Sequence, residues 1–226
     1  MKSIRAALAK SRYFGLLPAA VLTQFAALAR VKTLHEGAVS REACMVLEGR
    51  MRVRSITAQG EEFIYTDLGR GEFFGLSEIV ERARPPLEAY AVGPVTLAVF
   101  AGPALRALLD AQPVLWRPFA CLLYDHLVNT MLLARDVGVA PLQQRLARRL
   151  LWEARAGGEA SASRAPMNVN LSQSDLARML GTGRSVVNGE LKRLERAGAL
   201  TLGYRSVQLT DVAALRRLAG PDLPLP

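Results

Sequence analysis

The sequence predicts an α+β protein of two domains, in which a small β-roll precedes a long helix and a second, mostly helical domain. Its 226 residues are many for one core, since domains usually contain about 100 to 150 residues. Between residues 31 and 100, recurrent glycines separate short runs in which apolar and charged residues alternate, a pattern typical of small antiparallel β-structures. From residue 103 onward, apolar residues return to helical spacing. We place the domain boundary near Gly138, which gives domains 1–138 and 139–226.

The composition is that of a folded protein with few cysteines. Half of the residues are apolar and 22% are charged, enough to build a sizeable core. Cys44 and Cys121 are too few for a disulfide framework, so we expect a reducing cytoplasm. The first residues, MKSIRAALAKSR, do not read as a signal peptide. The longest uncharged run, 89–105, is too short to span a bilayer and contains glycines and prolines, so we expect no membrane association.

Positive charge is concentrated in the last third of the chain. The formal net charge is +9, and residues 141–226 contain 13 Lys and Arg against 7 Asp and Glu. Such a charge distribution attracts polyanions, either nucleic acid or an anionic membrane. An arginine-rich surface with no polyanionic partner is the alternative that charge alone leaves open.

The first domain begins with short helices and continues as a β-roll. Residues 12–30 have apolar side chains at helical spacing, with Pro18 near a helix start, where its missing N–H costs nothing. The segment VLEGRMRVRSI, residues 46–56, then alternates apolar and charged side chains with a period of two. We therefore expect antiparallel strands over about 31–100, forming a barrel or roll.

A short helix from Pro103 and a long helix at about 113–137 follow the roll. Apolar or small residues in the long helix recur at alternating intervals of four and three, a heptad pattern that indicates a dimer seam. Packing of this stripe on the roll of the same chain is the alternative. We expect Gly138 to end the helix, a further helix over 141–157, and a loop over 157–166. The predicted seam consists of Trp116, Ala120, Leu123, Leu127, Thr130, Ala134 and Val137.

The C-terminal domain contains two short amphipathic helices joined by a glycine turn. Ser172 is a candidate N-cap with Asp175 completing a capping box, and the first helix covers 173–180. Gly181 allows a tight turn into a second helix at about 184–197. The spacing turns Leu176, Ala177 and Leu180 of the first helix, and Val187, Leu191 and Leu194 of the second, toward a shared core.

A hairpin follows the helix pair. Two β-prone segments, 199–202 and 206–209, flank Gly203, Tyr204 and Arg205. A helix-turn-helix with such a wing, in the basic part of the chain, predicts binding to double-stranded DNA. Two amphipathic helices that only pack together are the alternative, but they would leave the basic excess and the small-residue turn unexplained.

The stretch LSQSDLARMLGTGRSVVNGELKRLERAGAL, residues 171–200, resembles the winged helix-turn-helix of the cyclic AMP receptor protein/fumarate-nitrate regulator (CRP/FNR) superfamily of bacterial transcription factors. The order of helices, roll, long helix and winged helix-turn-helix is also that of this superfamily. The resemblance implies an N-terminal cyclic-nucleotide-binding-like β-roll (jelly roll). It also implies a homodimer that binds a palindromic site, responds to an effector held in the roll and, as an activator, contacts RNA polymerase.

The start of the second helix is where base contacts are expected, because the N-terminal residues of a recognition helix meet base edges. Well-known members of the superfamily have a glutamate and an arginine where this chain has Ser185 and Gly189, so their operator sequence is not transferable. The predicted base contacts are Arg184, Ser185, Asn188 and Gly189. The predicted phosphate contacts are Ser172, Gln173, Lys192, Arg193, Tyr204 and Arg205.

The roll departs from the cyclic-nucleotide-binding relatives at the expected effector pocket. In those relatives a glutamate contacts the ribose and an Arg-Ser pair contacts the cyclic phosphate, whereas this chain has Leu76 and the pair Leu87-Glu88. Because a carboxylate repels a phosphate, we expect an effector other than cyclic AMP or cyclic GMP. Arg82 or Arg84 could supply the missing charge, so a cyclic-nucleotide-dependent regulator stays an alternative. The candidate pocket residues are Gly75, Leu76, Ser77, Leu87 and Glu88.

Other effectors and activities lack their ligands. No cysteine precedes Cys44, which argues against an N-terminal iron–sulfur cluster. Haem needs axial ligands, and His35 and His126, the only histidines, are better explained as ordinary surface or packed residues. A cupin-like metal oxygenase needs two or three clustered histidines, so we expect no enzyme, no metal and no cofactor, and the effector stays unidentified. A redox switch at Cys44 or Cys121 competes with a buried structural thiol. A ligand-binding or interaction module with a vestigial helix-turn-helix is the remaining alternative, and it would not bind DNA in a salt-dependent way.

Overall fold

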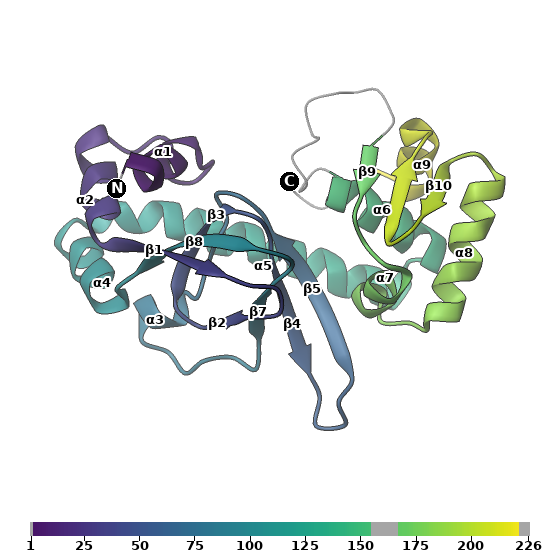
Figure 1. The fold of residues 1–226 in the computed structure, drawn as a ribbon, viewed down its shortest axis with the longest axis horizontal. Helices are drawn as coiled ribbons and strands as arrows, with labels where there is room; N and C mark the ends of the chain where they lie inside the picture. The colour runs from purple at the N-terminus through teal and green to yellow at the C-terminus, as the bar shows by residue number, and fades with distance from the viewer. Residues whose placement is uncertain (1, 155–166, 222–226) are drawn as a thin grey trace. The chain divides into compact units, whose positions relative to one another are not determined.

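The computed structural model describes residues 2–154 and 167–221 and divides the chain into two compact units, Met1–Tyr124 and Asp125–Pro226 (Figure 1). The division falls within the long helix α5 (Trp116–Val139), and the predicted boundary near Gly138 lies close to the end of this helix. The predicted loop at 157–166 lies outside the described residues.

The first unit is a β-roll of two four-stranded antiparallel sheets flanked by helices. One sheet has the order β1-β8-β3-β6 and the other β2-β7-β4-β5. Its strands are β1 (Ala29–Leu34), β2 (Val39–Ser40), β3 (Ala43–Glu48), β4 (Met51–Ile56), β5 (Glu62–Leu68), β6 (Phe73–Phe74), β7 (Glu88–Ala91) and β8 (Val95–Phe100). Its helices are α1 (Lys2–Lys10), α2 (Ala19–Ala27), α3 (Ser77–Val80), α4 (Gly102–Ala111) and a 3₁₀ turn at Pro113–Leu115, before α5.

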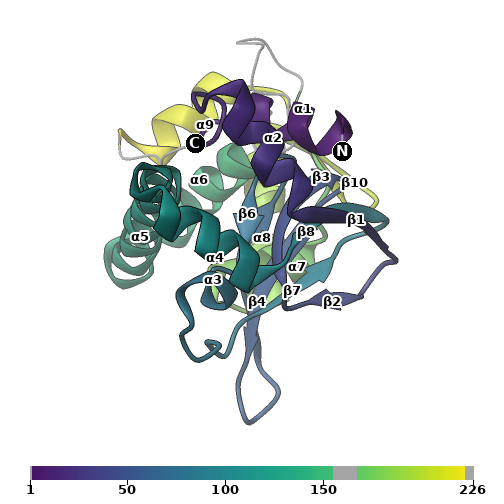
Figure 2. The same cartoon turned by 90° about the vertical axis from the view of Figure 1, so that its left-hand side faces the viewer.

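The β1-β8-β3-β6 sheet is covered on both faces. Along β3, Cys44 and Val46 point into the core between the two sheets, whereas Met45 and Leu47 point into a second core beneath the helices. This alternation follows from the period of two in a strand, and it explains why five consecutive residues of β3 are buried. Figures 1 and 2 show α1 and α2 beside each other over this sheet.

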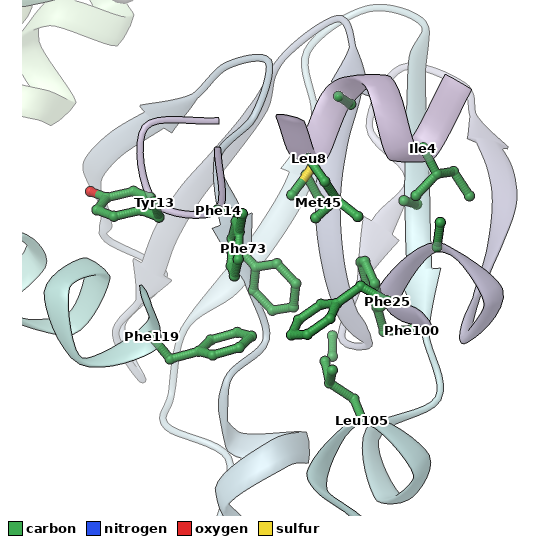
Figure 3. Close-up of a cluster of buried hydrophobic side chains, with 14 of the residues drawn as sticks. Ile4, Leu8, Tyr13, Phe14, Phe25, Met45, Phe73, Phe100, Leu105 and Phe119 are labelled. Carbon is green, nitrogen blue, oxygen red and sulfur yellow. The ribbon is translucent and has the colours of Figure 1, made fainter. Parts of the chain in front are cut away.

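The core beneath the helices, called here the helix-side cluster, is centred on aromatic rings (Figure 3). The ring of Phe119 from α5 lies edge-on to Phe14 at 5.2 Å and to Phe73 at 5.3 Å between centroids. Such edge-to-face pairs are favourable because the positive ring edge meets the negative ring face. Phe25 and Phe100 also belong to the cluster, so α5 is joined to the roll and to α2 by one continuous apolar contact.

Three boundaries differ from the predictions. A helix, α1, precedes the predicted segment 12–30, and within that segment the helix starts at Ala19, with Pro18 as its N-cap residue. Helix α5 does not end at Gly138 but continues to Val139, because a single exposed glycine lowers helix stability without breaking the backbone hydrogen bonds. The predicted strands over 31–100 are confirmed, with β1 starting two residues earlier, at Ala29.

The second unit is organised around α6 (Leu142–Ala154), whose polar side chains bind the ends of other helices. Arg148 donates from Nε to the Ala219 carbonyl at 2.6 Å and is paired with the buried Asp136 carboxylate of α5. Arg145 donates to the Leu180 carbonyl at 2.9 Å. These bonds satisfy carbonyls that a helix end leaves without intrahelical partners. The other elements are β9 (Met167–Val169), α7 (Gln173–Leu180), α8 (Arg184–Arg196), β10 (Leu200–Gly203), β11 (Ser206–Leu209) and α9 (Val212–Ala219).

Replacement of Phe119 by alanine should destabilise the first unit strongly. The ring is 1% exposed and contacts several other rings, so the substitution leaves a cavity that costs about 3–5 kcal/mol in the free energy of unfolding. Urea denaturation followed by circular dichroism measures this loss. Leu16→Ala is the control, because that side chain is 96% exposed and should change stability by less than about 0.5 kcal/mol. A loss for Phe119→Ala as small as that of the control would contradict the proposed packing.

Candidate nucleic-acid interface

Helix α7 begins with the predicted capping box. The Ser172 hydroxyl accepts from the Asp175 N–H at 3.1 Å, and the Asp175 carboxylate accepts from the Ser172 N–H at 3.2 Å. The two residues therefore satisfy each other's free backbone donors and fix the start of the helix. At the other end Gly181 has φ of 59°, the left-handed conformation that glycine adopts at low cost, and the chain turns into α8.

The two helices pack through the residues that the spacing predicted. The predicted inward residues are all buried: Leu176, Ala177 and Leu180 of α7, and Val187, Leu191 and Leu194 of α8. Met179 is also buried. The helix-turn-helix is thus confirmed in its element bounds and in its core.

The opposite face of α8 is polar and open. Arg184, Ser185, Gly189, Lys192 and Arg193 are exposed, whereas Asn188 is partly buried. Among the described residues, the side chains of Arg184 and Lys192 take part in no ion pair or hydrogen bond. Two cationic groups on this face are therefore available to phosphates or base edges.

Two features of the α8 surface stand out against the sequence prediction. Val186, next to the buried Val187, is 50% exposed and was not among the predicted contact residues. Gly189 has a helical φ, and a Cβ built there meets no atom within 4 Å. The fold therefore does not require glycine at this position, although glycine lowers helix stability by about 1 kcal/mol relative to alanine.

The wing is a hairpin joined to the end of α8. Strands β10 and β11 pair with Gly203 opposite Ser206, and Tyr204 and Arg205 form the turn between them. The Glu195 carboxylate of α8 accepts from the Leu202 N–H at 2.9 Å, which ties β10 to the recognition helix. Strand β9 and helix α9 extend the wing domain and were not predicted. Strand β9, at three residues, is too short for a periodicity signal.

The predicted dimer stripe is exposed along most of α5. Leu123, Leu127 and Val137 are 47%, 58% and 50% exposed. Ala120, Thr130 and Ala134 are exposed as well. Trp116 is only partly buried, packs on the helix-side cluster and donates from its indole nitrogen to Asp110 at 3.2 Å. Trp116 therefore has a structural role within its own chain, and the rest of the stripe offers an apolar surface.

The candidate effector residues differ in their surroundings. Gly75 has φ of 77°, and a Cβ there would collide with the Glu42 carbonyl oxygen, so close backbone approach explains this glycine. Leu76 packs against the helix-side cluster. Ser77 is partly buried at the start of α3, and Leu87 is 41% exposed.

The charge of Glu88 is not isolated, contrary to the prediction. Its carboxylate pairs with Arg54 at 3.2 Å and with Arg41 at 3.4 Å, so its charge is already compensated by residues distant in the sequence. Arg54 also pairs with Glu62 and lies over the Tyr90 ring, and burial raises the pKa of Tyr90. Repulsion of a phosphate by an isolated Glu88 is therefore not the reason to doubt a cyclic nucleotide. The reason that remains is the apolar character of the Leu76 and Leu87 side chains.

The two cysteines differ in environment. Cys44 is buried with its sulfur 3.5 Å from the Ser40 hydroxyl, and burial raises the pKa of its thiol to about 11. It is therefore protonated at neutral pH and behaves as a structural thiol. Cys121 is exposed on α5. Within residues 2–154 and 167–221, His, Cys, Asp and Glu form no group of three that could hold a metal ion. No helix in the described part of the chain is long and apolar enough to cross a membrane.

Comparison with known protein families finds both parts of the chain. Residues 33–112 match the family described as cyclic nucleotide-binding domain, and residues 144–218 match the Crp-like helix-turn-helix domain. The first match covers most of the roll and α4, and the second extends from α6 to α9.

Relatives with similar sequences span most of the chain. The CRP-like cAMP-activated global transcriptional regulator of Mycobacterium tuberculosis is 23% identical over 184 residues, covering 81% of this chain and 82% of that protein. The nitrogen fixation regulation protein FixK of Bradyrhizobium diazoefficiens is 27% identical over 179 residues, covering 77% and 72%.

Solved structures share the fold. The c-di-GMP responsive global regulator CLP of Xanthomonas campestris has a TM-score of 0.72 at 20% identity, over 85% of this chain and 99% of that one. FixK2 of Bradyrhizobium japonicum also has a TM-score of 0.72, at 19% identity, over 86% and 98%.

Proposed function

This chain belongs to the CRP/FNR superfamily of DNA-binding transcription regulators, and we propose that it acts in the cytoplasm as a homodimer on a palindromic DNA site. The observation that carries the proposal is the helix-turn-helix itself. A capped α7 and a left-handed Gly181 hold α8 with its apolar side packed and its cationic side open. In dimeric helix-turn-helix proteins this arrangement places the second helix in the major groove.

Arg184 is the principal base reader in this proposal. It is the first residue of α8, and its guanidinium, which has no partner among the described residues, can bind guanine O6 and N7 with two hydrogen bonds. Asn188 lies one turn further and can bind adenine in the same two-bond manner. Ser185 has a short side chain and Gly189 has none, so the duplex can approach this part of the helix closely.

The remaining contacts of the proposal fix position rather than sequence. Exposed Lys192 and Arg193 and the wing residues Tyr204 and Arg205 lie where phosphates can be bound. Gln173 adds its backbone N–H at the start of α7, where a helix can bind an anion, and Ser172 lies beside it. Such contacts raise affinity for any DNA and make it depend on salt.

The exposed stripe of α5 provides the dimer interface of the proposal. Leu123, Leu127 and Val137 would pair with the same residues of a second copy, which buries apolar surface that the chain leaves open to solvent. Two copies present two α8 helices, and a palindromic site matches their two-fold symmetry. If the position of the DNA site makes the protein an activator, the bound dimer would contact RNA polymerase.

The proposed control of this dimer does not involve cyclic AMP or cyclic GMP, although relatives are named for activation by cAMP. The ribose hydroxyl needs a polar acceptor, and Leu76 supplies an apolar side chain that is packed in the helix-side cluster. An effector of this roll would therefore be a different small molecule.

Selection of DNA from a random pool by the purified protein should yield a palindrome, and Arg184→Ala should relax one position of each half-site. Loss of a two-bond guanine contact costs about 1–3 kcal/mol per half-site at that base pair. Lys192→Ala is the comparison, since loss of a phosphate contact should weaken all sequences equally and reduce the salt slope by about 1. Failure to select any palindrome, with or without cell extract, would refute the proposed function.

Leu127→Lys should convert the dimer to a monomer. The side chain is 58% exposed at the centre of the stripe, so a charge there disturbs the interface without entering the core of its own chain. Sedimentation equilibrium measures the change in mass. Val139→Lys, at a residue 77% exposed outside the heptad stripe, is the control and should stay dimeric. An unchanged mass for Leu127→Lys would show that α5 does not form the interface.

Millimolar cyclic AMP or cyclic GMP should leave both the thermal midpoint and the affinity for the selected DNA unchanged. A ligand that binds the folded state at 100 times its Kd stabilises it by about 2.7 kcal/mol, which a thermal shift would reveal. Cell extract added in parallel tests whether another effector exists. A rise in DNA affinity on addition of either nucleotide would overturn this part of the proposal.

A further inference from the structure

The tip of the wing presents two large side chains that the fold does not use. Tyr204 is 93% exposed, and Arg205 is exposed beside it. Over the described residues, neither side chain makes a hydrogen bond, an ion pair or a ring contact. An aromatic ring and a guanidinium are thus placed together at the end of a hairpin in the DNA-binding unit.

Arg205 occupies a backbone position that suits glycine. Its φ is 51°, and among the described residues only one other non-glycine residue, Glu81, has a positive φ. Tyr204, the first residue of the turn, does not have a positive φ. A positive φ at the second central residue of a two-residue turn favours Gly or Asn, because a larger side chain crowds the backbone. Arginine is therefore held there at a conformational cost, and no contact within the described chain offsets that cost.

The strands on either side of this arginine are packed and bonded to the rest of the domain. Val207 and Leu209 of β11 are buried, and β11 is the central strand of the β10-β11-β9 sheet. The Thr210 hydroxyl donates to the Gly198 carbonyl at 2.8 Å, and Glu195 binds the Leu202 N–H. These contacts join the strands of the wing to α8 and to the turn after it.

The recognition helix has few side chains with which to read bases. In its first two turns, only Arg184 and Asn188 can make two-bond contacts with a base, because Ser185 is short and Gly189 has no side chain. Discrimination among sites then needs a contribution from outside the major groove, and the wing is the part of the domain positioned to supply it.

We infer that Arg205 does more than contact phosphate: it enters the minor groove beside each half-site and makes the protein prefer A·T pairs there. The two grooves alternate along a duplex, so a hairpin beside a helix in the major groove first meets a phosphate strand and then the minor groove. Runs of A·T pairs narrow this groove and concentrate negative potential in it, which attracts an inserted arginine. Tyr204 packs against the sugar–phosphate edge. This inference rests on the proposed function, in which α8 lies in the major groove.

The test uses duplexes that share the selected palindrome and differ only in the base pairs flanking each half-site. The flanks are A·T, G·C, or inosine·cytosine, which differs from G·C only in lacking the guanine N2 amino group of the minor groove. The wild-type protein should bind the A·T and inosine·cytosine duplexes on the order of fivefold more tightly than the G·C duplex.

Arg205→Gly separates DNA recognition from folding. Glycine suits the positive φ, so the thermal midpoint should stay equal or rise, whereas the three duplexes should now bind with equal affinity. Arg217→Ala is the matched control, since it removes one exposed positive charge from α9 and should retain the flank preference. Lower stability of Arg205→Gly would indicate a structural role for the arginine and contradict the inference.

Two results would overturn the inference while leaving the proposed function intact. One is equal binding of all three duplexes by the wild-type protein, and the other is an inosine·cytosine flank that behaves like G·C. The first would mean that Arg205 contacts only phosphate, and the second that the preference does not arise in the minor groove. If no palindrome is selected at all, the proposed function itself fails.

Discussion

Two anchors of different chemistry hold α5, and the open surfaces of the molecule depend on them. Near its start, Phe119 and Leu122 are buried in the helix-side cluster. Near its end, Asp136 is buried against Arg148, which also binds the last carbonyl of α9. Removal of one partner from such a buried pair is costly because the other charge is left unpaired. With these residues buried on one side of the helix, Leu123 and Leu127 remain on another side, where they are exposed.

Coverage of the β1-β8-β3-β6 sheet on both faces has consequences for the roll. The segment of β3 from Ala43 to Leu47 reads as a continuous apolar run, whereas β4 alternates apolar and charged residues. The charged side chains of β4 are not simply solvated: Arg52 is buried and makes two hydrogen bonds to Asp67, at 2.7 and 2.9 Å. Alternating charged residues in β4 therefore do not mark a solvated strand face, because one of them is paired inside the roll.

How far the sequence predicted the structure depended on the separation of the interacting residues. The capping box joins Ser172 to Asp175 and the inward face of α8 repeats within one or two turns, so both were predictable from local spacing. Glu88 was different, because its partners Arg54 and Arg41 lie 34 and 47 residues away and no local pattern reveals them. A carboxylate interpreted as an obstacle to phosphate proved to be a neutralised member of a network. The base, phosphate and pocket contacts themselves remain predictions, since they involve molecules outside the chain.

The shape of α8 also limits how this protein can distinguish DNA sites. A recognition surface of Arg184, Ser185, Asn188 and Gly189 supplies at most two side chains that bind a base edge with paired hydrogen bonds. Direct reading of few positions gives modest discrimination, whereas deformability and groove width contribute at positions that no side chain touches. The small residues Ser185 and Gly189 favour recognition through groove width and deformability, because close approach of the duplex to α8 brings the DNA backbone toward the wing. In the proposed complex, Gly189, which weakens α8, and Arg205, which strains the wing turn, both lower the stability of the free protein at exposed positions predicted to contact DNA.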